Sequence, residues 1–304
     1  SGKSMVFINK RPGYTSSAAY GGNAANGNRG AVLWTSASSF IAPAIFSMGN
    51  VGGTSTSVWQ EGGAGTQLGI DIPTTSSCLY LTETRVNGVG TLAGVFTDSA
   101  TTSTEMWFYS EGASSWAYVS SANFPPNQSP ALPLTGPNAI THMDGYTFAM
   151  SQNGQIWNSD QNQISSYGTT NFIPAQSFPD GGVGLARYKN LIVAFGKYSI
   201  EFFQNGGLTP APLVPVGNTV RRLGAAVVTQ SLPSIQEAGD TVYFIGTSAD
   251  TGQSAIYRLN GYTPEKVSTP AIDKLVNNQY ITYFRGVMNL LGQNHIVLSG
   301  ATGI

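Results

Sequence analysis

A strand-turn-strand pattern recurs along this chain at nearly constant spacing. Each copy opens with a polar turn residue, continues as an apolar run of strand length, turns, and enters a second such run. The clear copies open at Asp144, Asn190 and Asp240, so their spacings are 46 residues (144 to 190) and 50 residues (190 to 240). A looser copy opens at Thr91, 53 residues before the first of these (91 to 144).

A repeat of roughly 40 to 50 residues with several short antiparallel strands is typical of a β-propeller. One such sheet cannot bury both of its faces alone, whereas sheets stacked around an axis bury face against face and leave only short edges. A β-sandwich is the competing architecture, but it does not explain the regular spacing. We therefore expect an all-β protein, a propeller with antiparallel blades of about 45–50 residues.

The copy between residues 239 and 278 shows the pattern most clearly. Its strand-like runs are Thr241–Ile245 and Ala255–Leu259, and Asn260-Gly261 supplies a tight turn after them. Thr269 then precedes Pro270, a pair that suits the start of a helix. The sequence therefore predicts one short helix near residues 270–277.

The remaining organisation follows from this repeat. We interpret residues 1–304 as a single propeller-type domain with room for at least four blades, cut from a longer polypeptide at one or both ends. Residues 15–30 are Ser, Ala, Gly and Asn without periodicity, which predicts a flexible loop. Residues 123–137 hold five prolines and almost no charge, which predicts an extended connector between blades.

Charged residues make up only 10% of the chain, and the formal net charge is −1. Average soluble domains contain roughly 25% charged residues. A polar surface with few charges suits a protein buried in an assembly and argues against a general nucleic-acid binder, although the pair Arg221-Arg222 could form a local patch.

Cys78 is the only cysteine, and we expect it to pack as a small buried residue. No apolar run approaches the length of a membrane span.

No arrangement of residues for catalysis, metal binding or cofactor binding emerges. His142 and His295 are far apart and lack ligand-spaced partners, so we expect no zinc site, and His142 is expected to be a packed or hydrogen-bonded side chain. Residues 151–157 are similar to the Asp-box hairpin of sialidase-type propellers, with Asn153 in place of Asp and a spacing one residue short. That box is structural, so it supports a propeller and no activity. We expect no enzyme and no cofactor.

Several motifs in residues 140–278 resemble the packaged-DNA stabilisation proteins and related tail-hub or nozzle proteins of short-tailed bacteriophages. The resemblance rests on motifs that each combine a strand with a turn, namely 143–146, 184–196, 199–203, 256–262 and 267–272. The turn 10–13 is similar to one near the start of that family. Residues 15–130 match poorly.

This resemblance implies a structural virion protein of the phage tail that retains the packaged genome until ejection. It implies a homo-oligomeric ring, hexameric in the family, that contacts the portal or adaptor and other tail proteins and through which double-stranded DNA passes transiently. Its working parts would be surfaces. The candidate structural or interaction residues are Arg11, Asp144, Tyr146, Trp157, Arg221, Arg222, Arg258 and Tyr262.

A second hypothesis comes from a different class of protein. The chain could be a carbohydrate-binding or glycan-degrading propeller of a phage receptor-binding component, with exposed Trp rings as a sugar platform. A carboxylate pair beside an arginine cluster in one cleft would favour this alternative. Buried Trp rings between blades would disfavour the platform.

Overall fold

The structure is a computed structural model. It describes residues 31–34, 44–51, 55–60, 66–68, 72, 76–97, 104–175, 177–178, 180–225, 234–278, 283–290 and 293–299. The predicted 15–30 loop and the candidate residue Arg11 lie outside these ranges, and the side chain of Cys78 is not among those described.

The described residues form six consecutive antiparallel sheets, which we number blades 1 to 6. Blade 1 contains β1 (Ala31–Trp34), β2 (Ala44–Val51), β3 (Ser55–Gln60) and β4 (Thr66–Gln67). Blade 2 contains β5 (Ser76–Val86), β6 (Val89–Thr97), β7 (Thr104–Ser110) and β8 (Ala117–Tyr118). Blade 3 contains β9 (Ile140–Met143), β10 (Tyr146–Met150), β11 (Gln155–Asn158) and β12 (Phe172–Pro174).

The other three blades follow in the same order along the chain. Blade 4 contains β13 (Gly182–Tyr188), β14 (Leu191–Gly196), β15 (Ile200–Asn205) and β16 (Leu213–Pro215). Blade 5 contains β17 (Leu223–Ala225), β18 (Ile235–Ala238), β19 (Thr241–Ser248), β20 (Ser254–Asn260) and β21 (Thr263–Lys266). Blade 6 contains β22 (Tyr283–Leu290) and β23 (Gln293–Ser299).

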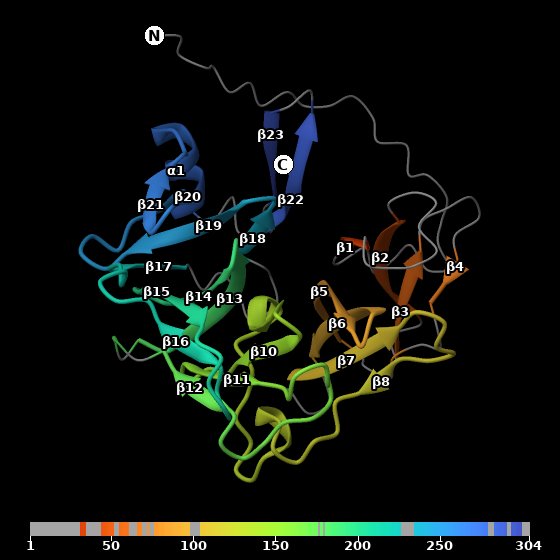
Figure 1. The fold of residues 1–304 in the computed structure, drawn as a ribbon. Helices are drawn as coiled ribbons and strands as arrows, with labels where there is room; N and C mark the ends of the chain where they lie inside the picture. Colours follow the sequence, from red (N-terminus) through yellow and green to blue (C-terminus); the bar gives the residue numbers. More distant parts are fainter. Residues whose placement is uncertain are drawn as a thin grey trace.

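The sheets succeed one another around a common centre, as Figure 1 shows. In each blade the first strand lies innermost, because β1 contacts β5, β5 contacts β9, β9 contacts β13, β13 contacts β18 and β18 contacts β22. Blade 5 has a divided first strand, since β17 and β18 both pair with β19. This arrangement confirms the predicted all-β propeller.

Alternate residues of a strand pack into two different hydrophobic cores, one on each side of the blade. In β14, Ile192 and Ala194 join the core shared with blade 3, whereas Val193 and Phe195 join the core shared with blade 5. Strand β6 follows the same rule between blades 1 and 3. Because successive side chains point to opposite faces, a strand buried on both faces is a continuous apolar run. This is the reason for the runs found in the sequence.

The first hairpin of each of blades 2 to 5 turns at a residue with positive φ. These residues are Asn87 (φ 49°), Asp144 (φ 53°), Lys189 (φ 56°) and Gly239 (φ 57°). The looser copy aligned on Thr91 is therefore corrected, because Thr91 lies inside β6 and the matching turn is Asn87-Gly88. Asn-Gly favours such two-residue hairpins because both positions tolerate positive φ.

Hydrogen bonds at the first turns of blades 2, 3 and 4 join each of these blades to the one that follows it. They link the first turn of one blade to the loop between the last two strands of the following blade. The three bonds are Asn87 Nδ2 to Asn162 O (3.5 Å), Asn205 Nδ2 to Asp144 Oδ2 (2.8 Å) and Gly261 N to Tyr188 Oη (2.9 Å).

The predicted helix is α1 (Pro270–Asn277), which confirms its position. Thr269 is its N-cap residue, although the Thr269 side chain makes no capping hydrogen bond. Instead, the carboxamide of Asn277 bonds to the backbone N–H and C=O of Ser254 at 2.9 and 2.8 Å, which holds the helix against β20. No helix among the described residues is both long enough and apolar enough to cross a membrane.

Candidate interaction surface

The turn between β14 and β15 presents an exposed aromatic ring on a rigid backbone. The carboxylate of Asp180 accepts hydrogen bonds from Tyr198 N (2.6 Å) and Ser199 Oγ (3.1 Å). Gly224, in the next blade, packs directly against the backbone of this turn, so close that a Cβ there would lie 2.3 Å from Tyr198 N. The Tyr198 side chain nevertheless remains 48% exposed. The fold thus fixes the turn and leaves its ring facing solvent.

Two of the four candidate arginines, Arg221 and Arg222, lie in the segment that meets β15 just after this turn. The backbone of Arg221 exchanges hydrogen bonds with Ile200 at 2.9 and 3.0 Å, and its guanidinium donates to the carbonyls of Asn218 and Val220. The Arg222 guanidinium lies 5.7 Å from the ring centre of Phe178 and 3.7 Å from Asp250. The side chains of Arg222 and Asp250 are 66% and 74% exposed, so their ion pair contributes little to stability. We call Phe178, Lys197, Tyr198 and Arg222 the Tyr198 edge.

Two further carboxylates, those of Asp180 and Glu201, lie near this turn, and a carboxylate pair beside arginines in one cleft is what a glycan-cleaving site would need. Both carboxylates, however, are already used to hold the chain. Glu201 is buried and accepts hydrogen bonds from Ser177 N and Ser177 Oγ, both at 2.8 Å. Asp180 is bound to Tyr198 and Ser199 as above. The geometry therefore supports structural roles for these acids and an exposed Tyr/Arg surface suited to binding a partner.

The hairpin similar to an Asp-box forms and is structural. Ser151 Oγ donates to Asn153 Oδ1 at 2.6 Å, and Gln155 N donates to the same oxygen at 3.1 Å. Trp157 is buried and stacks on Phe172 with ring centres 4.6 Å apart. Trp34 and Trp116 are also buried, and Trp107 is half-buried. Among the Trp side chains that the structure describes, none offers an exposed sugar platform.

Three further candidate residues lie away from the Tyr198 edge. Asp144 and Tyr146 flank the first turn of blade 3, where Asp144 is exposed and Tyr146 packs near Phe148. Tyr262 is 40% exposed and packs edge-on against Phe202 with ring centres 5.2 Å apart, so it connects blade 5 to blade 4. The structure therefore distributes the predicted residues over several blades.

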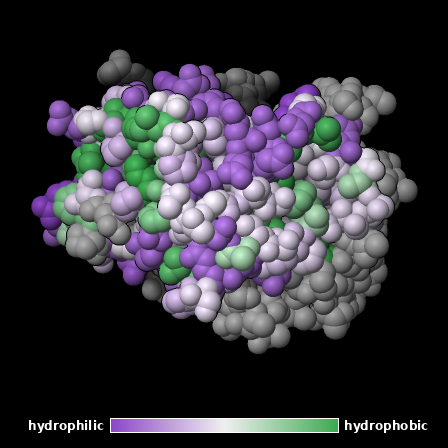
Figure 2. Space-filling view, turned by 60° about the horizontal axis from the view of Figure 1, so that its bottom comes forward, coloured by the Kyte–Doolittle hydropathy of each residue, from purple (hydrophilic) through white to green (hydrophobic). Residues whose placement is uncertain are grey.

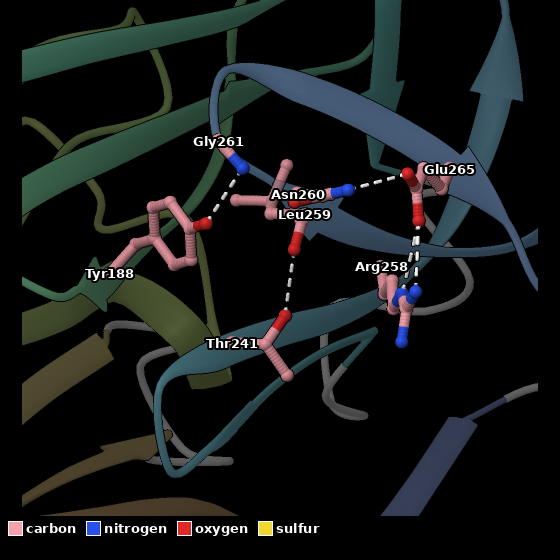
Figure 3. A network of polar contacts seen from close by, with 7 residues as sticks. All are labelled: Tyr188, Thr241, Arg258, Leu259, Asn260, Gly261 and Glu265. Atoms are coloured by element: carbon pink, nitrogen blue, oxygen red, sulfur yellow. Dashed lines mark hydrogen bonds and ion pairs between the residues drawn. The ribbon is translucent and has the colours of Figure 1, made fainter.

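The segment around Arg258 joins blades 4 and 5 through polar contacts (Figure 3). Arg258 donates to one oxygen of Glu265 from Nε (3.2 Å) and Nη2 (3.0 Å), and Asn260 donates to the other at 2.6 Å. The bonds from Asn260 and Arg258 lower the pKa of Glu265. Gly261 N donates to Tyr188 in the neighbouring blade. The Arg-Leu-Asn-Gly motif is therefore a joint between blades.

The centre of the propeller is filled by a segment of the same chain. Two short 3₁₀ turns, η2 (Pro125–Asn127) and η3 (Pro137–Ala139), lie between β8 and β9. All three residues of η3 are buried, and η3 contacts the inner strands of blades 2 and 4. The Asn138 side chain reaches blade 5, where it donates to Ile235 O (3.0 Å) and accepts from Ile235 N (3.3 Å).

Ionisable side chains surround this centre. Glu237, in blade 5, accepts hydrogen bonds from Arg187 N in blade 4 (2.7 Å) and Thr141 Oγ1 in blade 3 (3.4 Å). Burial raises the pKa of Glu237, although these hydrogen bonds act in the opposite direction. His142 is 6% exposed and pairs through Nδ1 with Thr147 Oγ1 at 3.0 Å, which confirms the expected packed histidine. Burial, and secondarily Arg187, lower the pKa of His142 to about 3.

We expect His142 to make the fold sensitive to acid. The pKa of this imidazole is about 6.5 in the unfolded chain and about 3 in the folded chain. Between these two pH values the unfolded chain therefore binds a proton at His142 that the folded chain does not bind. Stability from this group is therefore lost as the pH falls, by about 1.4 kcal/mol per unit. His142→Asn, which can keep a bond to Thr147, should lose less stability than the unaltered protein between about pH 6.5 and about pH 4.5. Urea unfolding at both pH values checks this, and equal losses would contradict it.

Sequence reasoning missed the residues that matter most to this geometry. Asn138 follows Pro137, the last residue of the predicted connector. Tyr198 begins a strand-like run, and no element was predicted around Gly224. A Gly-Pro-Asn sequence signals a turn, but nothing local says that it lies on the axis. The described residues contain no group of three or more His, Cys, Asp or Glu side chains placed to hold a metal ion.

The surface is consistent with an assembly component. Figure 2 shows one face on which hydrophilic residues surround small, separate hydrophobic patches. The fold that the described residues define is an all-β propeller.

Comparison with known proteins specifies the family. Residues 72–283 match the phage-stabilisation family described as bacteriophage P22 Gp10, beta-propeller, and the chain belongs to that family. This is a family of structural phage proteins, which indicates a virion component. No curated protein sequence shows significant similarity to the chain.

Three solved structures show some similarity to this chain, each at 11% sequence identity. The computationally designed Ika8 protein matches over 91% of this chain and 69% of its own, at 11% identity and a TM-score of 0.45. The AfRom2 CNH domain matches over 72% and 62%, at 11% identity and 0.41. A eukaryotic initiation factor matches over 74% and 51%, at 11% identity and 0.38. Since all three TM-scores are low, we draw nothing from them.

Proposed function

We propose that this protein is a structural subunit of a bacteriophage tail, where copies form a ring at the head-to-tail junction and retain the packaged genome until ejection. Membership of the phage-stabilisation family supports a structural role in the virion. The proposed partners are further copies of the chain, six by the family resemblance, together with the portal or adaptor and other tail proteins. Double-stranded DNA would pass the ring transiently.

The observation that carries this proposal furthest is the occupied axis. Pro137–Ala139 are buried at the centre of the propeller, and Asn138 is bonded across it to Ile235. A duplex therefore has no path along the axis of one subunit. A DNA passage has to run between subunits, which is the geometry of a ring in which each propeller is a solid block.

The low charge of the chain fits the same role. Proteins that hold duplex DNA tightly do so with many Lys and Arg contacts to phosphates. This chain has 14 Lys and Arg against 15 Asp and Glu, so it offers no general phosphate-binding surface. A lumen built from such subunits would let DNA slide during ejection.

The proposal is tested with particles of the phage that encodes the chain. We expect particles assembled without this protein to package DNA and then lose it, measured as DNA digested by added nuclease. Adding the purified chain should restore protection, and electron microscopy should show a ring at the tail junction. Protected DNA in particles that lack the protein would overturn the retention role. A purified chain that stays monomeric and binds glycans would favour the receptor-binding alternative.

A further inference from the structure

The Tyr198 edge has the composition and the rigidity of an interface anchor. Tyr and Arg are enriched among residues that dominate binding energy at interfaces, and aromatic side chains contribute most when the backbone is held in advance. Here Asp180 and Gly224 hold the turn, while Tyr198 is 48% exposed and Arg222 is 66% exposed. No ring in the described part of the chain contacts the ring of Tyr198.

Charge is distributed unevenly between the two sides of the propeller. The described residues of blades 1 and 2 include three acidic residues (Glu83, Glu105 and Glu111) and one basic residue (Arg85). Residues 182–278, which contain blades 4 and 5, hold eight basic residues and six acidic ones. Lys197 and Arg222 place two of these cations at the Tyr198 edge, and the Arg222 guanidinium also lies 3.7 Å from Asp250. Figure 1 shows blades 1 and 2 on one side of the centre and blades 4 and 5 on the other.

We propose that the Tyr198 edge of one copy binds the acidic side of blade 2 of a second copy. This inference rests on the proposed ring and specifies its contact. Two different surfaces on opposite sides of one subunit make a head-to-tail contact, and such a contact closes into a ring when the rotation between copies allows it. Complementary charge steers the copies into this register and disfavours like surfaces meeting.

The residues of blade 2 that we assign to the acidic surface are Glu105 and Glu111. Glu105 lies on β7 and accepts a hydrogen bond from Trp107 Nε1 at 3.0 Å, and both carboxylates are half-buried. The proposal needs their negative charge and does not need them to be free of partners inside the subunit.

The first experiment measures assembly of the full chain by sedimentation velocity. We expect Tyr198→Ala to weaken association at least about tenfold, because hot-spot truncations of aromatic anchors have effects of this size. Leu208→Ala is the matched control, since Leu208 is 54% exposed on the same blade but lies outside the Tyr198 edge. It should assemble normally. Equal assembly of both variants would overturn the proposal, provided that circular dichroism shows both to be folded.

The second experiment decides between head-to-tail and symmetric contacts. Arg222→Glu and the double variant Glu105→Lys with Glu111→Lys each damage one of the two surfaces, so each should remain monomeric alone. Mixed together, they retain one intact pair of surfaces, and the second pair meets with its charges exchanged, so the mixture should recover assembly that neither variant shows alone. A symmetric contact between two Tyr198 edges predicts instead that the double variant assembles normally, which would overturn the proposal.

The behaviour of the unaltered chain distinguishes a failure of the proposed ring from a failure of the proposed contact between copies. If it forms rings and the surface variants do so as well, the ring stands and this contact is wrong. If the unaltered chain does not assemble at any concentration or salt, the proposed ring itself fails, and this contact fails with it. We also expect assembly to weaken as salt is raised from about 0.05 M to about 0.5 M, because exposed charges are screened.

Discussion

Gly224→Ala is expected to lower the free energy of unfolding by about 3 kcal/mol, at the upper end of the cost of overpacking. A Cβ at this position would lie 2.2 Å from Lys197 C, 2.3 Å from Tyr198 N and 2.4 Å from Gly196 O. All three atoms belong to the backbone, so no side chain can rotate away to make room. Relief would require blades 4 and 5 to separate, and that would disturb the core that they share. Denaturant unfolding measures the loss.

Gly217→Ala is the matched control for this prediction. A Cβ at Gly217 meets no atom within 4 Å, and its φ lies outside the region that favours glycine. The change should therefore stay within about 0.5 kcal/mol. Similar losses in the two variants would show that Gly224 is not required by close packing between the blades.

Asn138→Ala is expected to lower the free energy of unfolding by about 2–4 kcal/mol. The substitution removes both hydrogen bonds to Ile235 and leaves a backbone N–H and a C=O without partners at a buried site, where each costs about 1–3 kcal/mol. The void is small, so packing contributes less than the lost bonds. Asn138 can lie this close to β13 because Gly184 has no Cβ, which would otherwise lie 2.7 Å from the Cβ of Asn138. Thermal unfolding with a probe in blade 5 checks the prediction.

The exposed Asn190 supplies the comparison, because Asn190→Ala makes the same chemical change at the surface, in the turn between β13 and β14. It should alter stability by no more than about 0.5 kcal/mol. If Asn138→Ala were equally mild, the side chain would not be joining blade 5 to the centre. The proposal that each subunit is a solid block would then lose its main support.

The hairpins were predictable because they depend on residues close in sequence. The apolar runs of strand length, the Asn260-Gly261 turn and the Thr269-Pro270 helix start each involve a few neighbouring positions. The elements β20, β21 and α1 follow them closely. The looser copy at Thr91 was misaligned because a strand buried on both faces is apolar throughout, so its start carries no marker. The Asn87-Gly88 turn was the better signal.

The candidate surface was predictable only in part. The pair Arg221-Arg222 was considered as a possible local patch. The backbone of Arg221 bonds to Ile200, two residues after Tyr198, and the Arg222 guanidinium lies over Phe178. Nothing near Tyr198 in the sequence distinguishes it from other turn residues. Its significance comes from Asp180, 18 residues earlier, and from Gly224, in the next blade. Trp157 was correctly expected to pack between blades rather than to form a sugar platform.

The amino-acid sequence alone determined the strands, the turns, the repeat and therefore the all-β propeller. Each of these arises from side-chain periodicity and backbone preferences within a few residues. Only the tertiary structure decided what lies at the centre and what faces outward. Asn138 and Ile235 are 97 residues apart, and their hydrogen bonds form only after three blades have stacked around the axis. The same stacking brings Gly224 against the backbone of the turn that carries Tyr198, while Tyr198 itself stays exposed.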